Sequence, residues 1–88
     1  MRQEAEFFDD REMDLIYIAK RLSDAQALEA ELTAAEWDYY VEADQYKGGF
    51  LFASLRTGAF FYVPLAKAEE ARAFLQATGY RPQPPVDG

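Results

Sequence analysis

The alternation of apolar and polar positions predicts one strand and one helix in the first half of the chain. Residues 14–19 are β-branched and aromatic, with apolar residues on both parities, which is typical of a central strand. Ser23 and Gln26 have the spacing of a capping box, and an amphipathic helix is predicted over residues 24–35. The inner stripe of that helix consists of Ala25, Leu28, Leu32 and Ala35.

The middle of the chain has the alternation of half-buried strands. Over residues 37–43, Trp37 and Tyr39 share one face, whereas Tyr40 and Glu42 share the other. The elements predicted after this strand are, in chain order, a loop over residues 44–49, a strand over 50–55, a turn over 56–58 that uses the positive φ open to glycine, and a strand over 59–65.

A second amphipathic helix is predicted from Ala66 or Lys67 onward. Its inner stripe consists of Ala68, Ala71, Leu75 and Thr78, widened by Phe74. Gly79 is predicted to end the helix in the left-handed conformation, with Tyr80 supplying the apolar contact of such a cap. The three prolines within residues 82–88 predict extended, unpaired backbone and therefore a mobile tail.

The order of these elements predicts the fold class. A strand, a helix, strands that include a hairpin, and a second helix, with or without a short final strand, place two crossover helices on one face of an antiparallel sheet. We therefore predict an α+β protein with the ferredoxin-like split β-α-β arrangement. Residues 13–81 form its single domain, residues 1–12 a flexible or partly helical arm, and residues 82–88 the mobile tail.

Composition agrees with one small globular domain. The 88 residues are 50% hydrophobic and 28% charged, and a chain of this length buries only about 60–65% of its unfolded surface. No apolar run approaches the roughly 20 residues that span a bilayer, and residues 1–4 lack the apolar stretch of a signal peptide. Because cysteine is absent, disulfides are excluded. These features predict a cytoplasmic protein with no contact to membranes.

The residue types exclude most catalytic chemistry. The chain contains no His and no Cys, so the usual nucleophile–base pairs and nitrogen- or sulfur-ligated metal sites cannot form. Glu42 and Asp44 lie two apart on one strand face and could hold a hard cation, but a solvated edge is the favoured interpretation. The net charge of −7 disfavours nucleic-acid binding. We therefore predict a non-enzymatic domain without a cofactor or a metal site.

The aromatic residues are unevenly distributed, since nine of the fourteen lie within residues 37–62. They occupy both parities of the predicted strands, so they predict a second apolar surface on the sheet, although burial of all the rings in the core is an equal alternative. The residues of this predicted self-association face are Tyr40, Phe50, Phe52, Phe60 and Tyr62. The predicted loop is a second candidate for partner contact, through Tyr46, Lys47, Gly48 and Gly49.

Several runs of residues share their pattern of apolar positions with a known family. These runs are Ile16-Tyr17-Ile18-Ala19, Asp24-Ala25-Gln26-Ala27-Leu28-Glu29-Ala30-Glu31-Leu32, Tyr39-Tyr40-Val41-Glu42, Phe61-Tyr62-Val63-Pro64 and Ala68-Glu69-Glu70-Ala71-Arg72-Ala73-Phe74-Leu75. Over residues 15–80 the chain resembles a small bacterial family described as signal-transducing proteins with a fold like that of the nitrogen-regulatory PII proteins.

The resemblance implies a ferredoxin-like fold and a regulatory or binding role, and it carries over no catalytic or nucleotide-binding residue. PII proteins contact partners through the loop between their second and third strands, and residues 44–49 occupy a similar but shorter segment. We predict a non-catalytic regulatory or protein-binding domain that forms a homodimer or another homo-oligomer. The alternative is a small enzyme or ligand-binding protein of the dimeric α+β barrel type, with Glu42 or Arg56 facing a pocket between paired sheets.

Overall fold

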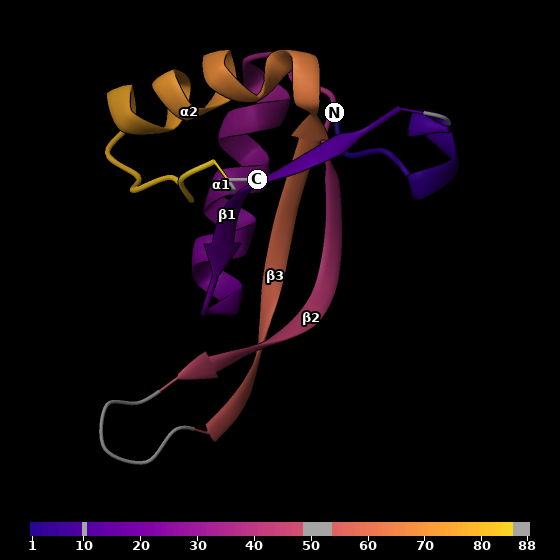
Figure 1. Ribbon diagram of the computed structural model, residues 1–88. Helices are drawn as coiled ribbons and strands as arrows, with labels where there is room; N and C mark the ends of the chain where they lie inside the picture. The colour runs from indigo at the N-terminus through magenta and orange to yellow at the C-terminus, as the bar shows by residue number, and fades with distance from the viewer. Residues whose placement is uncertain (10, 49–53, 86–88) are drawn as a thin grey trace.

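The computed structural model describes residues 1–9, 11–48 and 54–85, which form one antiparallel sheet and two α-helices (Figure 1). The elements are η1 (Ala5–Phe8), β1 (Met13–Ala19), α1 (Leu22–Ala34), β2 (Tyr40–Gly48), β3 (Ser54–Pro64), η2 (Leu65–Lys67) and α2 (Ala68–Ala77). The strand order is β1-β3-β2, so α1 crosses over β3 to connect two parallel strands. This topology confirms the predicted α+β fold and split β-α-β arrangement.

The core lies between the sheet and the two helices. Phe61 and Val63 of the central strand β3 have no exposed surface, and they pack with Leu28 of α1 and Leu75 of α2. Tyr39, just before β2, is 1% exposed, and its hydroxyl is satisfied by the side chain and backbone of α1. The helix stripes predicted from the sequence supply these contacts, except that their last members, Ala35 and Thr78, are exposed.

Strand β1 differs from the predicted central strand because it lies beside β3 at one side of the sheet and contains a bulge. Leu15 is opposite Tyr62 and Tyr17 is opposite Phe61, which leaves Ile16 without a partner in the register. The bulge turns both Ile16 and Tyr17 toward the core. A central position is therefore not the reason why apolar residues occur on both parities of this strand.

The hairpin of β2 and β3 is longer than predicted and projects beyond the helices (Figure 1). Residues 44–48 continue β2, so the predicted loop there is wrong, and residues 49–53 lie outside the described part of the chain. The turn predicted at residues 56–58 is also wrong, because β3 is continuous and Gly58 pairs with Asp44. A Cβ atom at Gly58 would lie 3.1 Å from the Ala19 carbonyl oxygen, so glycine permits close packing there rather than a turn.

Helix α1 begins at Leu22, before the predicted capping box. Its N-cap is Arg21, which makes no side-chain capping bond, and the Ala25 N–H already donates to the Arg21 carbonyl at 3.0 Å. Ser23 is therefore inside the first turn, and the prediction that it caps the helix is wrong. Local capping preferences are weak compared with the packing of the apolar stripe, which determines where this helix meets the sheet.

Both helices end in the same hydrogen-bonding motif. At the end of α2, Tyr80 N–H donates to the Leu75 carbonyl at 2.8 Å and Gly79 N–H to the Gln76 carbonyl at 3.2 Å. Gly79 has φ of 93°, which confirms the predicted left-handed cap. At the end of α1 the equivalent left-handed residue is Glu36, with φ of 63°. This cap was not predicted from the sequence, because the residue there is not a glycine.

Replacing Glu36 with glycine is expected to stabilise the protein by about 0.5–1 kcal/mol. A residue with a Cβ atom pays about 1–2 kcal/mol in the left-handed region, and the greater freedom of glycine in the unfolded chain offsets part of the gain. Urea unfolding measures the difference. Glu36→Ala is the matched control, since it removes the carboxylate but retains the Cβ atom. An equal gain in both variants would contradict the conformational explanation.

The two terminal segments lie along opposite sides of the sheet. Arg2 forms an isolated parallel bridge with Tyr39, and the Gln3 N–H donates to the Tyr39 carbonyl at 2.8 Å. Residues 5–8, within the predicted arm, form η1, and Phe8 there is 3% exposed. At the other end, residues 81–85 run beside β1, where Gln83 N–H donates to the Ile16 carbonyl at 2.7 Å. Among the described residues, no helix has the length and apolar character needed to cross a membrane.

Candidate functional site

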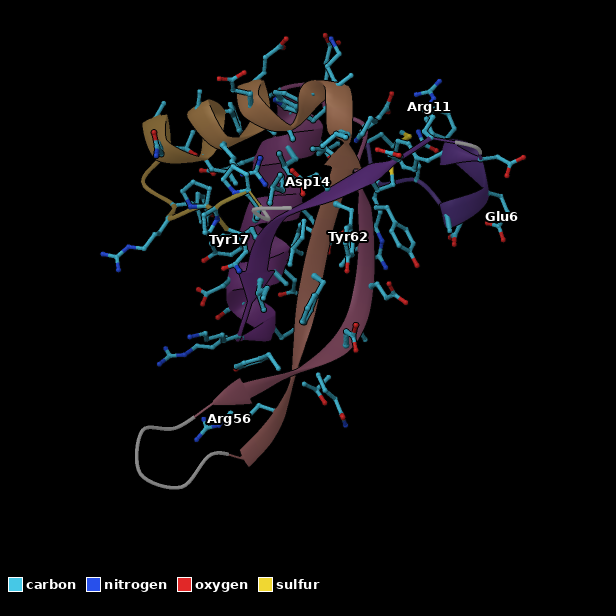
Figure 2. The ribbon with its side chains drawn as sticks, viewed as in Figure 1. Glu6, Arg11, Asp14, Tyr17, Arg56 and Tyr62 are labelled. Atoms are coloured by element: carbon cyan, nitrogen blue, oxygen red, sulfur yellow. The ribbon has the colours of Figure 1, made fainter. Side chains whose placement is uncertain are left out.

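The register of the sheet assigns each strand residue to one of two faces. Val41 and Tyr17 flank Phe61 on the face that packs against the helices. The neighbouring positions point the other way, and none of them belongs to the core cluster. This second face, here named the open face, comprises Leu15, Ile18, Tyr40, Glu42, Asp44, Tyr46, Arg56, Phe60 and Tyr62. Figure 2 labels Tyr62 near the middle of the sheet and Arg56 on the projecting hairpin.

Three of the five predicted self-association residues meet on the open face. Tyr40 and Tyr62 are directly opposite one another, with ring centroids 5.9 Å apart, and Phe60 lies in the next row of the same face. The other two, Phe50 and Phe52, lie outside the described residues. Period-two alternation was sufficient to place the first three, because each lies in a regular part of β2 or β3.

The predicted loop residues occupy different positions. Tyr46 belongs to β2 and to the open face, where the Lys20 Nζ lies 5.7 Å from the centre of its ring. Lys47 and Gly48 also belong to β2, opposite Leu55 and Ser54, and Gly49 lies outside the described residues. Tyr46 is therefore part of the same surface as Tyr40 and Tyr62, and not the tip of a separate loop.

The aromatic and aliphatic side chains of the open face are half-buried or buried rather than broadly exposed. Phe60 is only 8% exposed in the single chain, although no helix of the described residues covers it. Ile18 and Glu42 lie opposite it on the adjacent strands. Tyr40 and Tyr62 keep intermediate exposure. The most exposed large apolar side chains of the described residues lie elsewhere: they are Met1, Phe7, Leu22 and Leu65. A second copy would therefore gain more from the tyrosines and aliphatic residues than from Phe60.

Acidic side chains give the open face its electrostatic character. Burial raises the pKa of Tyr62, and the nearby charges of Glu42 and Asp44 raise it further. The phenol therefore remains protonated at neutral pH and can donate a hydrogen bond. Within the described residues, no group of three or more potential ligands could hold a metal ion. The Glu42 and Asp44 side chains on this face are exposed to solvent.

Arg72 is the polar residue that sequence reasoning missed. From α2 its Nη2 atom donates to the Asp14 carboxylate at 2.8 Å and to the Leu15 carbonyl at 3.1 Å, while Nε donates to the Gln83 carbonyl at 2.6 Å. The side chains of Arg72 and Asp14 are each 13% exposed. The available signal was Asp14 itself, a single carboxylate at the start of an otherwise apolar strand, which predicts a buried partner.

The described surface also contains hollows away from the open face. One, of about 380 Å³, is lined by Trp37 and Phe8 and has charges of both signs on its rim, including Arg11 and Lys67. No buried side-chain nitrogen or oxygen atom lacks a hydrogen-bond partner in the described part of the chain.

Comparisons with protein families, curated proteins and solved structures gave no match to this chain.

Proposed function

We propose that this protein is a non-catalytic binding domain that associates with a second copy through the open face of its sheet. One observation supports it most directly: the register places Tyr40, Phe60 and Tyr62 on the face opposite the helices, together with Leu15 and Ile18. No element among residues 1–9, 11–48 and 54–85 covers that face as the helices cover the other. Tyrosine is also among the residues enriched in protein interfaces.

The expected association is weak. Burying a large apolar side chain contributes about 1.5–3 kcal/mol, but Phe60 has already lost most of its accessible surface. The gain must come from half-buried residues, chiefly Leu15, Ile18, Tyr40 and Tyr62. Loss of rotational and translational freedom offsets much of it, so the dissociation constant should lie in the micromolar range or above.

Charge opposes the association and gives it a measurable salt dependence. Each copy carries −7, and the exposed Glu42 and Asp44 lie on the open face itself. Repulsion between exposed charges is screened as ionic strength rises. The dimer is therefore expected to strengthen between low and physiological salt, which sedimentation measurements can follow.

Changing Tyr40 to glutamate is expected to weaken the dimer roughly tenfold or more, because the substitution removes an aromatic contact and adds a third carboxylate to the face. Sedimentation velocity from micromolar to near-millimolar protein measures the dissociation constant. Leu22→Glu is the matched control, since Leu22 is 74% exposed on α1, away from the open face. A wild-type chain that stays monomeric throughout, or equal weakening by both substitutions, would contradict the proposed interface.

A pocket between two paired sheets is the second candidate, because Glu42 and Asp44 accompany the aromatic residues on the open face. In that arrangement Glu42 or Arg56 would face an enclosed ligand. A thermal-shift screen with small metabolites separates the two functions. A specific stabilising ligand whose effect is lost in Glu42→Gln supports the pocket, whereas a dimer without any such ligand supports the binding domain.

A regulatory role, which the resemblance to PII-like signalling proteins implies, extends the same proposal. PII proteins contact partners through the loop between their second and third strands, and the β2–β3 hairpin joins the second and third strands of this chain. Figure 2 labels Arg56 on this hairpin, and Tyr46 is its partner in the register. A partner that binds the hairpin would compete with or reinforce self-association, because these residues share the open face.

A further inference from the structure

The segment of residues 81–85, here named the strap, occupies the outer side of β1 without forming a regular strand. In Figure 1 it returns from the end of α2 toward β1. Its backbone is bonded to β1 through the Gln83 N–H, which donates to the Ile16 carbonyl at 2.7 Å. The Gln83 carbonyl accepts a second hydrogen bond, from Arg72 Nε at 2.6 Å. Both backbone groups of Gln83 are therefore satisfied by groups outside the strap.

Main-chain hydrogen bonds to an exposed strand edge are one way in which proteins bind extended peptides. Here the β1 edge accepts the Gln83 N–H, and the Arg72 side chain of α2 holds the Gln83 carbonyl. Prolines suit the flanking positions, because Pro82 and Pro84 have no N–H that would need a partner. The sequence Pro82-Gln83-Pro84-Pro85 also favours the polyproline II conformation, which loses little entropy when it binds.

The strap does not fill the surface on which it lies. A hollow of about 390 Å³ remains between the strap and the side chains of Tyr17, Lys20, Asp24 and Tyr46. The ring of Tyr17 is further supported by an edge-on contact with Tyr80, at 5.4 Å between centroids. Aromatic rings beside an extended proline-rich segment are the usual lining of polyproline-binding grooves.

We propose that the outer edge of β1, together with Arg72 and this hollow, is a binding site for an extended proline-rich peptide of a partner protein, and that the strap occupies the site in cis. The strap indicates which peptide the site would bind. That peptide has prolines on both sides of a residue whose backbone N–H and C=O groups are free to form hydrogen bonds, as Gln83 has in the strap. The backbone contact of Gln83 is to the edge of β1 and not to its face, but the hollow shares Ile18 and Tyr46 with the open face.

The strap is suited to be displaced. Arg81, Pro84 and Pro85 are exposed, and only Pro82 and Gln83 are half-buried. The strap is tethered to its site, so it competes with an added peptide at an effective concentration on the order of 1 mM. The added peptide can bind only those chains in which the strap is open, and its apparent affinity is reduced in proportion to that fraction. Weakening the strap should therefore tighten binding of the same sequence added in trans.

The experiment uses the full chain and the labelled peptide acetyl-Arg-Pro-Gln-Pro-Pro-amide, followed by fluorescence anisotropy. Gln83→Pro removes the N–H that donates to Ile16 and is expected to raise the affinity of the peptide roughly tenfold. Gln83→Ala keeps that N–H and should bind as the wild type does. The peptide acetyl-Arg-Ala-Gln-Ala-Ala-amide should bind clearly more weakly. Equal affinity in both variants, or no preference for the proline-containing peptide, overturns the inference.

Hydrogen exchange of the wild-type chain tests the same site without any substitution. If the peptide displaces the strap, the Gln83 amide should lose its protection as peptide is added, while the Tyr80 amide, which caps α2, stays protected. Unchanged protection of Gln83 at saturating peptide overturns the inference even if the Gln83→Pro variant fails to fold.

Discussion

Replacing Phe61 with alanine is expected to lower the free energy of unfolding by about 3–5 kcal/mol, which approaches the total stability of a small domain. Phe61 lies on the central strand and has no exposed surface. Its ring stacks on Tyr39 at 6.0 Å and meets the edge of Tyr17 at 6.4 Å. Truncation therefore leaves a cavity that both helices and two other strands border, and that none of them can fill without moving.

Urea unfolding of the variant measures this loss. Phe61→Leu keeps most of the volume and should cost much less than the alanine variant, which gives a graded series if Phe61→Ala does not fold. Phe7→Ala is the control, because Phe7 is 48% exposed in the N-terminal segment and its truncation should change stability by less than about 1 kcal/mol. Similar losses for Phe61 and Phe7 would contradict the assignment of the core.

The second large effect is expected for Arg72→Met, which should destabilise the protein by about 2–4 kcal/mol. The substitution keeps the apolar stem but removes donors to Asp14, Leu15 and Gln83. The Asp14 side chain, which is only 13% exposed, would then lack the positive charge that pairs with it. The strap would also lose one of the two hydrogen bonds that hold Gln83. Loss of an ion pair with this little solvent exposure exceeds the effect of a surface pair.

A double-mutant cycle separates the ion pair from the other bonds. Asp14→Leu combined with Arg72→Met removes both charges, so the double variant should be more stable than the sum of the two single losses predicts. Arg81→Met is the control, since Arg81 is exposed and forms no ion pair within the described residues. Additive losses in the cycle would show that Arg72 acts through the carbonyls and not through Asp14.

The open face shows which part of the candidate site could be predicted from the sequence. Tyr40, Phe60 and Tyr62 share a face because strands alternate with period two, and that rule needs no knowledge of the partner strand. The exposure of each ring was not predictable in the same way. Phe60 is nearly buried, and its neighbours Ile18 and Glu42 come from two other strands and meet it only through the register.

The elements themselves were largely determined by local patterns along the sequence. The apolar stripes of both helices, the left-handed cap at Gly79 and the order of strands and helices follow from spacings of a few residues, and the structure confirms them. Three other features were decided by tertiary contacts. They are the bulge at Ile16, the position of Gly58 inside a strand, and the hydrogen bonds from Arg72 to Asp14 and Gln83. Each of these depends on which distant segments lie side by side, and the free energy of that packing exceeds the small local preferences that a sequence displays.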